Sequence, residues 1–192
     1  MLRKQWKAGN SIYPLPVVLV SVGDIKGVKN IITLAWVGTI VSEPPMCSIS
    51  VRPERYSNKI IKDSKEFVIN LTTKKLAYAT DWCGVKSGRD FDKFKEMRLT
   101  PIAAQKVKAP LIKESPINIE CKVKDILSYG THDIFISEVV AVNASPAYIN
   151  SKTGDFDFMK TKPICYCHGH YYEVGKYVGK FGWSVQKNKI NK

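Results

Sequence analysis

The sequence has no long apolar run and few histidines, and each shortage excludes a class of protein. Its apolar stretches, such as Val17–Val20, are far shorter than the roughly 20 residues of a membrane-spanning helix, so we expect neither a membrane span nor a membrane partner. Only three histidines occur among 192 residues. The motifs His-Glu-x-x-His, Gly-x-Ser-x-Gly and Gly-x-Gly-x-x-Gly are missing from the sequence, which argues against familiar hydrolases and a fingerprint-type dinucleotide site.

The chain also lacks the cysteine density of a disulfide scaffold. An odd number of cysteines in a chain of this size favours a reducing compartment, and we expect a cytoplasmic protein. The basic N-terminus precedes an apolar segment, residues 12–22, much as in a secretory signal. However, Pro14, Pro16 and several β-branched residues favour a strand there. The five cysteines are Cys47, Cys83, Cys121, Cys165 and Cys167.

Acidic residues are scarce relative to basic ones. The sequence has 30 Lys and Arg against 17 Asp and Glu, a formal charge of +13, which would attract an anionic partner. The basic residues are dispersed, and no zinc-finger, ribonucleoprotein or GXXG signature accompanies them, which disfavours nucleic acid. A basic nucleic-acid- or anion-binding module without redox activity stays as the alternative function.

Hydrophobic residues make up 44% of the sequence, enough for one globular domain over residues 1–192. Short β-branched runs bounded by Gly, Pro, Asn and Ser predict a mainly β fold, a closed or partly closed antiparallel barrel with helical insertions. Alternation after Ile117 predicts a strand whose wet face carries Asn118 and Glu120, and residues 128–131 read as a hairpin connection. Strands are expected at 17–22, 31–40, 47–51, 67–71, 117–124 and 134–142, and helices at 57–62 and 74–82.

Small and polar residues follow one face of the expected strand in the segment Asn30–Ile40. Such a face could receive a flat ring with polar edges, or it could simply be the solvated side of a sheet. On this face lie Thr33, Ala35, Val37 and Thr39, with Ser48 and Ser50 on the next strand.

Two basic segments could bind an anion. Arg52 and Ser57 flank an expected helix start, where free N–H groups and the helix dipole favour a phosphate; the alternative is an ordinary Ser N-cap beside an exposed Arg. The charged loop 83–94 could bring further donors to anionic oxygens or simply be solvated. These donors are Ser87, Arg89 and Lys93.

A run of soft ligands, residues 165–170, could on ligand type hold zinc or copper. On a regular strand Cys165 and Cys167 would share one face, and His168 and His170 the other. Four ligands around one ion would need an irregular backbone, so we expect no metal site.

Five motifs occur in a fixed order along the chain. They are T-x-A-W-V-G, P-P-M-x-S-I-S-x-R-P-x-R-Y-S, A-x-x-T-D-x-C-G-x-x-S-G-R-D-x-D-K-F, Gly-x-His-x-x-Phe and G-K-F-G-W-S. The motifs and their order closely resemble those of flavoredoxin and related proteins of the flavin reductase-like family. The resemblance extends from about Tyr13 to Ser184.

The resemblance implies an FMN-binding split barrel that holds the flavin non-covalently, as a homodimer with the flavin near the subunit interface. It implies an FMN-dependent oxidoreductase in electron transfer, either a flavoredoxin-like carrier or an NAD(P)H-dependent flavin reductase. The partner would be a nicotinamide nucleotide or a redox partner protein. A flavin carries the electron chemistry itself, which agrees with a sequence that shows no nucleophile or metal motif.

The resemblance also assigns residues. The first strand segment, which Asn30 begins, would line the isoalloxazine ring with Thr33, Ala35, Trp36, Val37, Gly38 and Thr39. The ribityl phosphate would have three residues near it, Ser50, Arg52 and Ser57. The charged loop would approach the phosphate or the ring edge with Ser87, Arg89 and Lys93. Against the ring would lie Tyr166 and the candidate catalytic residue His132, a hydrogen-bond donor to the ring or to an approaching nicotinamide. The resemblance gives no role to Cys165, Cys167 and His170.

Overall fold

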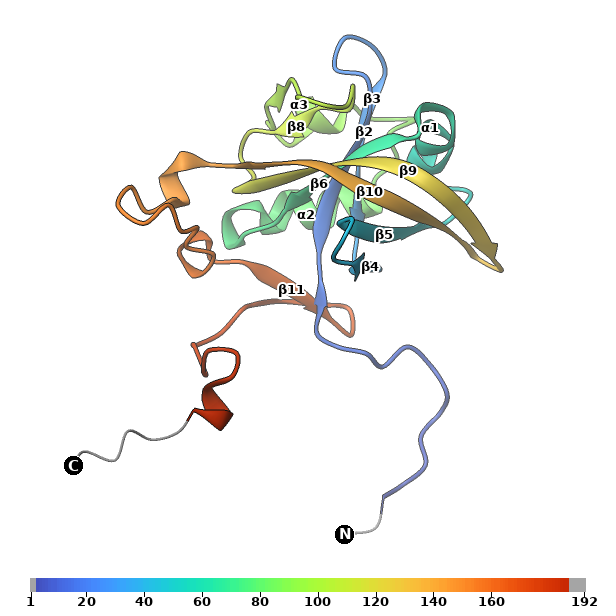
Figure 1. The fold of residues 1–192 in the computed structure, drawn as a ribbon. Coiled ribbons are helices and arrows are strands. Elements are labelled where there is room, and N and C mark those ends of the chain that lie inside the picture. Colours follow the sequence, from blue (N-terminus) through green and yellow to red (C-terminus); the bar gives the residue numbers. More distant parts are fainter. Residues whose placement is uncertain (1–2, 187–192) are drawn as a thin grey trace, which may run out of the picture.

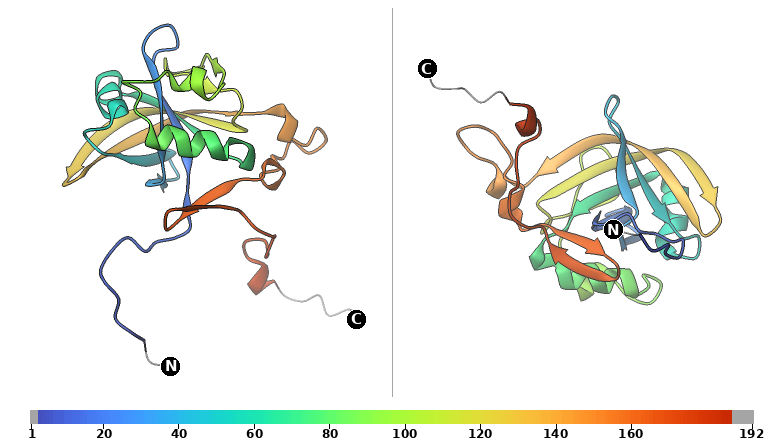
Figure 2. Two further views of the ribbon diagram at one scale, coloured as in Figure 1. Left: turned by 180° about the vertical axis from the view of Figure 1, so that it is seen from behind. Right: turned by 90° about the horizontal axis from the view of Figure 1, so that it is seen from below.

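The computed structural model describes residues 3–186, and the ends of the expected domain, residues 1–2 and 187–192, lie outside that range. Its main sheet is antiparallel and coils into a barrel (Figures 1 and 2). The two edge strands of this sheet, β3 and β4, follow one another in the chain. The strand order is β3-β2-β6-β9-β10-β5-β4. The bounds are β2 Val18–Gly23, β3 Lys29–Leu34, β4 Val37–Val41, β5 Met46–Val51, β6 Glu66–Leu71, β9 Ile117–Tyr129 and β10 His132–Ala144.

Two small sheets and several short helices surround this barrel, which confirms the predicted mainly β fold with helical insertions. One small sheet has the order β1-β11-β12, with β1 Leu15–Pro16, β11 Ile164–Cys167 and β12 His170–Glu173; the other pairs β7 Pro101–Ile102 with β8 Leu111–Ile112. The α-helices are α1 Tyr56–Ser64, α2 Ala77–Val85 and α3 Lys93–Glu96. The 3-10 turns are η1 Lys74–Leu76, η2 Pro146–Tyr148, η3 Met159–Thr161 and η4 Trp183–Val185. Among the described helices none is long and apolar enough to cross a membrane.

Strands β2 and β3 are buried on both faces, and this explains their nearly continuous apolar sequence. Val20 and Ile32 point into the barrel interior, where Phe135 is fully buried. On the opposite face, Leu19 and Ile31 belong to a second cluster that includes residues of α2 and α3. Figure 2 shows α2 lying across the outside of the barrel. The second cluster consists of Leu19, Ile31, Leu76, Ala79, Cys83, Phe94, Leu99 and Ile112.

The predicted strand 31–40 is wrong as one element, because the chain turns between β3 and β4. Ala35 and Trp36 form the break: Val37 N donates to Ala35 O at 3.0 Å, and Ser50 N donates to Trp36 O at 2.9 Å. The turn allows β4 to pair with β5 at the far edge of the sheet. Strict alternation of side chains is therefore lost after Leu34, and the expected common face does not form.

The wet face predicted for β9 is also wrong at its first two polar positions. Asn118 and Glu120 are buried. The Glu120 carboxylate accepts three consecutive backbone N–H groups, from residues 105–107, at 2.6–3.2 Å, and the Asn143 amide at 2.8 Å. These hydrogen bonds keep the pKa of Glu120 below its usual value despite burial. A loop covers this face of the sheet, and the two polar side chains help to hold the segments that pack there.

Candidate functional site

Two adjoining cavities open between the barrel, α2 and the loop that follows it. Each has a volume of about 280 Å³, and they share Ile32 and Arg55. We call the first the aromatic cavity, because it is lined by Trp36, His132, Tyr166 and Tyr171. We call the second the basic cavity, because it is lined by Arg55, Lys86, Arg89 and Lys93.

Aromatic side chains from separate elements form a wall of the aromatic cavity. Trp36, in the turn after β3, and His132, at the start of β10, have ring planes within 16° of parallel and centroids 6.4 Å apart. Tyr166 of β11 lies at the same centroid distance from Trp36, tilted by 48°. Across the hairpin, Tyr171 pairs with Tyr166 and donates its hydroxyl to Asp81 at 3.1 Å. Burial, together with Asp81, raises the pKa of Tyr171 to about 12.

Lys93 is the central feature of the basic cavity. Its side chain is 4% exposed, and its Nζ donates to the carbonyl oxygen of Cys83 at 2.7 Å. Within residues 3–186 no carboxylate forms an ion pair with it. Burial lowers the pKa of Lys93 to about 8, and the nearby charge of Arg55 also lowers it. A buried cation without a counter-ion is costly, and an anion in this cavity would remove the cost.

A glycine allows the loop to close over the basic cavity. Asn30 Nδ2 donates to Ser57 Oγ at 2.9 Å, and both residues are buried. A Cβ atom added to Gly88 would lie 2.2 Å from Asn30 Oδ1, far inside van der Waals contact. A side chain at this position would therefore displace the buried side chain of Asn30 on β3.

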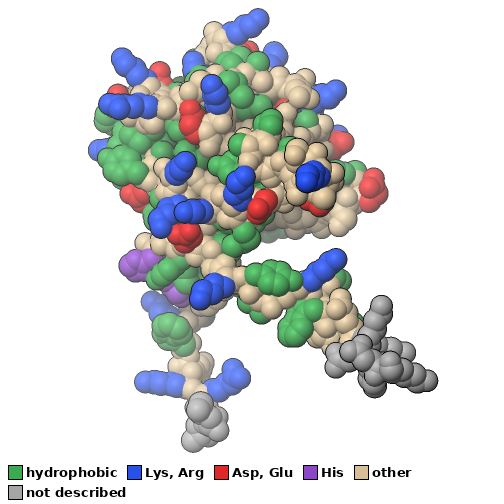
Figure 3. Space-filling view, turned by 90° about the vertical axis from the view of Figure 1, so that its left-hand side faces the viewer, with side chains coloured by type: hydrophobic (Ala, Val, Ile, Leu, Met, Phe, Trp, Pro, Cys, Tyr) green, Lys and Arg blue, Asp and Glu red, His purple; other side chains and the backbone are tan. Residues whose placement is uncertain are grey.

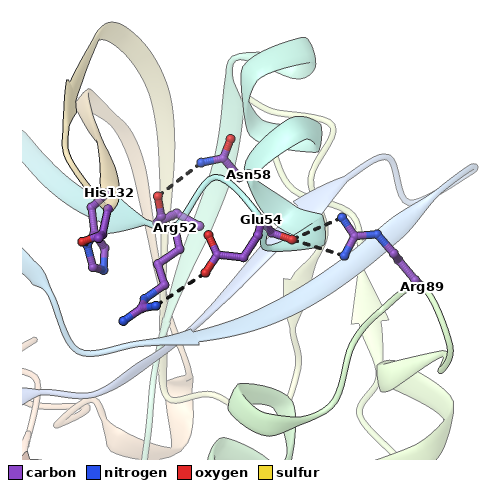
Figure 4. A network of polar contacts seen from close by, with 7 residues as sticks. Arg52, Glu54, Asn58, Arg89 and His132 are labelled. Atoms are coloured by element: carbon purple, nitrogen blue, oxygen red, sulfur yellow. Dashed lines mark hydrogen bonds and ion pairs between the residues drawn. The ribbon is translucent and has the colours of Figure 1, made fainter.

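Arg52 and Arg89 lie on opposite sides of the turn at Pro53 and Glu54 (Figure 4). Arg89 donates from both terminal nitrogens to the Glu54 carbonyl oxygen at 3.2 Å and lies over the Tyr56 ring. Arg52 faces the other way, toward His132, and its guanidinium forms an ion pair of 3.5 Å with the Glu54 carboxylate. One short turn thus lies between Arg52 and Arg89, whereas Arg55 lines both cavities.

The structure brings most of the predicted site residues to these cavities, in an arrangement that differs from the expected one. Ser50 and Arg52 were expected beside Ser57, but they line the aromatic cavity, whereas Ser57 lines the basic cavity. The aromatic cavity holds Thr33, Ala35, Trp36, Ser50, Arg52, His132 and Tyr166. The basic cavity holds Asn30, Ser57, Ser87, Arg89 and Lys93. Neither cavity is lined by Val37, Gly38 or Thr39, because these residues follow the turn that ends β3.

Arg55, which the sequence did not predict as a site residue, lines both cavities. Nor did the sequence predict Lys86, which lines the basic cavity. Arg55 is the N-cap of α1, which has no side-chain cap hydrogen bond. A signal for it was present, since Arg55 is the second arginine of the motif R-P-x-R-Y-S.

The cysteine and histidine segment forms a hairpin, which corrects the expected arrangement of its side chains. β11 ends at Cys167, and His168 and Gly169 make the turn with positive φ angles. Cys167 lies directly opposite His170, so these two side chains share a face with Cys165 rather than opposing it. Among the described residues, no group of three or more candidate ligands is placed to hold a metal ion.

An aromatic-walled cavity and a basic cavity thus lie side by side. The aromatic wall suits a flat ring, and Lys93, which has no carboxylate partner among the described residues, suits an anionic group such as a phosphate. The fold and this site define the class of FMN-binding split barrels.

The chain belongs to the flavin reductase-like family: the model of the flavin reductase like domain matches residues 10–175. A flavoredoxin of Desulfovibrio vulgaris (Miyazaki F) superposes with a TM-score of 0.88 at 28% identity, over 96% of this chain and 100% of that one. Flavoredoxin from Methanosarcina acetivorans gives 0.82 at 29% identity, with the same two coverages. An uncharacterised protein of Pyrococcus abyssi is 35% identical over 130 residues, 68% of this chain and 74% of its own. The family typically binds FMN and includes FMN-dependent oxidoreductases.

Proposed function

We propose that this protein binds FMN non-covalently across the two cavities and acts as an FMN-dependent oxidoreductase in electron transfer. The observation that carries the proposal is Lys93, a buried cation without a carboxylate partner among the described residues, in a cavity that adjoins an aromatic one. Membership of a family that typically binds FMN supports it.

Residues of the basic cavity would hold the phosphate. Lys93 supplies a buried positive charge, and Arg89 and Ser57 supply donors near the N-terminus of α1. That helix end adds a favourable dipole for an anion. The hydrogen bond from Asn30 to Ser57 leaves the Ser57 hydroxyl hydrogen free to point toward a ligand.

Residues of the aromatic cavity would hold the ring. Bound FMN supplies hydride and single-electron chemistry, so the protein's task is to position it and tune its surroundings. Trp36 and Tyr166 provide apolar surface. The Thr131 hydroxyl lies 2.9 Å from His132 Nδ1. When this hydroxyl donates to Nδ1, the ring proton is on Nε2, which could then donate a hydrogen bond into the cavity and stabilise negative charge there.

The direct test of the proposal is cofactor content. We expect the purified protein to be yellow and denaturation to release FMN. The apoprotein should bind FMN more tightly than riboflavin, which lacks the phosphate. A colourless protein without affinity for FMN would overturn the proposal and favour the anion-binding alternative.

Two electron donors fit this proposal, a reduced nicotinamide nucleotide and a redox partner protein. Anaerobic mixing of the FMN-loaded protein with NADH and with NADPH distinguishes them. Loss of flavin colour with either nucleotide would identify a flavin reductase. No loss with either would favour a flavoredoxin-like carrier that receives electrons from a protein.

Nucleic-acid binding has less support. Figure 3 shows lysine and arginine side chains scattered over one face of the molecule, with acidic side chains among them. A nucleic-acid site would need a continuous basic patch and would lose duplex affinity steeply with salt. Titration of a DNA duplex at low salt tests this alternative, and we expect no binding.

We also propose that the protein forms a homodimer. The segment after β12 extends away from the barrel (Figures 1 and 2). It carries large exposed apolar side chains. Tyr177 is 77% exposed, Trp183 is 59% exposed, and Phe181 is fully exposed. A second copy could cover this surface. Light scattering should give twice the chain mass of 21.6 kDa, and Phe181→Ser should shift the mass toward that of a monomer.

A further inference from the structure

We propose that Cys165 and Cys167 form a thiol–disulfide exchange site on the face of β11 that points away from the aromatic cavity. The site takes a small disulfide such as oxidised glutathione. This activity lies outside the two cavities and does not depend on bound FMN.

The first argument is the placement of the two thiols. Cys165 and Cys167 alternate with Tyr166 along β11, and Tyr166 lines the aromatic cavity, so both cysteines lie on the opposite face of the strand. The other three cysteines of the chain are buried, whereas these two are partly exposed. A reagent in solution can therefore reach Cys165 and Cys167 while the fold stays intact.

The second argument is that the two thiols can join. Residues two apart on a strand have Cα atoms about 6.6 Å from one another. Disulfides span Cα separations of up to about 6.8 Å, so a bridge between Cys165 and Cys167 is within reach but close to the limit. Cys167 ends β11 at a two-residue turn, His168 and Gly169, which can absorb a small displacement. A disulfide that is exposed and near its geometric limit is readily reduced again, as exchange requires.

The third argument is an imidazole beside one of the thiols. His170 lies directly opposite Cys167 across the hairpin, whereas Tyr172 lies opposite Cys165. Side chains in such cross-strand pairs have Cβ atoms about 4.5–5.5 Å apart, so the His170 ring can take the proton of the Cys167 thiol. The thiolate is the nucleophile in disulfide exchange. Cys167 is therefore the attacking thiol, and Cys165 is the resolving one.

The exchange consists of two balanced steps. The Cys167 thiolate attacks one sulfur of the small disulfide, which forms a mixed disulfide and breaks the original S–S bond. The released thiolate takes the proton held by His170 and leaves as a thiol. Cys165 then attacks the sulfur of Cys167, so that the internal bridge forms, and the second thiol leaves with the proton of Cys165. Two electrons and two protons pass from protein to substrate, and two molecules of the reduced thiol return them in the reverse exchange.

The surroundings of the thiols indicate the kind of disulfide. Cys165 and Cys167 lie on the middle strand of their sheet, between β1 and β12. The His170 and Tyr172 rings, with centroids 6.4 Å apart, lie on the same face of β12 and narrow the approach. The formal charge of +13 favours an anionic substrate. Oxidised glutathione is both slim and anionic.

The experiment follows the reaction of the apoprotein with oxidised glutathione under native conditions, by mass spectrometry and peptide mapping. It compares wild type, Cys165→Ser and a matched pair of variants, His170→Asn and His168→Asn. The His168 ring lies against Tyr13, with centroids 4.3 Å apart. His168→Asn therefore removes a nearby imidazole but not the one opposite Cys167, and asparagine tolerates the positive φ of this position.

We expect wild type to lose the mass of two hydrogen atoms and to yield a peptide in which Cys165 and Cys167 are bridged. Cys165→Ser should stop at the mixed disulfide and keep one glutathione on Cys167. His170→Asn should react about a hundredfold more slowly, as expected on loss of a general base. His168→Asn should react as wild type does.

An unreactive wild type would overturn the inference. So would stable glutathione adducts on wild type without an internal bridge, because the two thiols would then not act together. Equal rates in wild type and His170→Asn would also contradict it, since nothing would distinguish the pair from ordinary surface thiols. An equal loss of rate in both histidine variants would count against it as a general effect on the hairpin. Because the apoprotein is used, none of these outcomes bears on FMN binding, and a failure to bind FMN would leave this inference standing.

Discussion

Replacing Lys93 by methionine should stabilise the apoprotein while impairing its use of FMN. The buried ammonium group has a pKa of about 8, lowered from 10.5 by desolvation. Because the pKa of a cation is lowered on folding, the protonated form destabilises the fold below pH 8, and the penalty disappears as the pH rises toward 10.5. This lowering of the Lys93 pKa from 10.5 to about 8 corresponds to a destabilisation of the folded state by about 3 kcal/mol.

Urea unfolding of the apoproteins measures this effect. We expect Lys93→Met to raise the free energy of unfolding at pH 7, and to raise it about 2 kcal/mol less at pH 10, where the wild-type lysine is neutral in the folded state. Lys95→Met, on the exposed side of the same short helix, should show no such difference between the two pH values. An equal gain at both pH values in Lys93→Met would refute the reasoning.

The same substitution should reduce FMN affinity selectively. Loss of a charge-assisted hydrogen bond costs about 1.5–3 kcal/mol, which is roughly a 10- to 150-fold weaker affinity. Riboflavin has no phosphate, so its affinity should be unchanged in Lys93→Met. A parallel loss of FMN and riboflavin affinity would show that Lys93 supports the cavity and not the phosphate.

Three other substitutions test separate parts of the structure. His132→Ala should retain FMN but slow its anaerobic reduction about tenfold, which corresponds to a rise of about 1.4 kcal/mol in the activation free energy. Stopped-flow absorbance measures the rate, and an unchanged rate would exclude the donor role of His132. Gly88→Ala should displace Asn30 and weaken FMN binding while circular dichroism stays that of wild type; unchanged binding would mean that the loop adapts. Lys62 and other donors lower the pKa of Asp133 to about 2 from 3.8, so this buried carboxylate stabilises the fold above pH 3.8 and loses its effect as the pH falls through 2. Wild type should therefore lose about 2 kcal/mol more than Asp133→Asn between pH 6 and pH 2 in urea unfolding, and equal losses would contradict the assignment.

The sequence predicted the strands that obey simple patterns. The ranges 17–22, 47–51 and 67–71 differ by one residue at most at each end from β2, β5 and β6. Each combines β-branched or aromatic residues with turn-forming residues at its ends, and these signals are local. The family resemblance also named five residues that line the basic cavity, although it missed Arg55 and Lys86; the five are Asn30, Ser57, Ser87, Arg89 and Lys93.

The sequence could not predict the features that depend on distant contacts. Glu120 alternates with apolar neighbours as a solvated residue does, and only the loop at residues 105–107 makes it buried. Lys93 lies in a charged segment, and nothing in its neighbours indicates that α2 and β3 enclose it. Arg52 and Ser57 are close in the sequence, yet the turn between them directs their side chains into different cavities.

The two cavities differ in the part of the molecule that encloses them. Helix α2 lines both cavities, with Asp81, Gly84 and Val85 in the aromatic one and Cys83 in the basic one, but only the basic cavity is also lined by an α3 residue, Lys93. Cys83 and Phe94 belong to the second apolar cluster, outside the barrel interior. We expect this outer layer to open locally while the barrel stays folded, so its amides should exchange with deuterium sooner than those of β2. A ligand held at Lys93 would then leave through local opening of α2 and α3, without global unfolding.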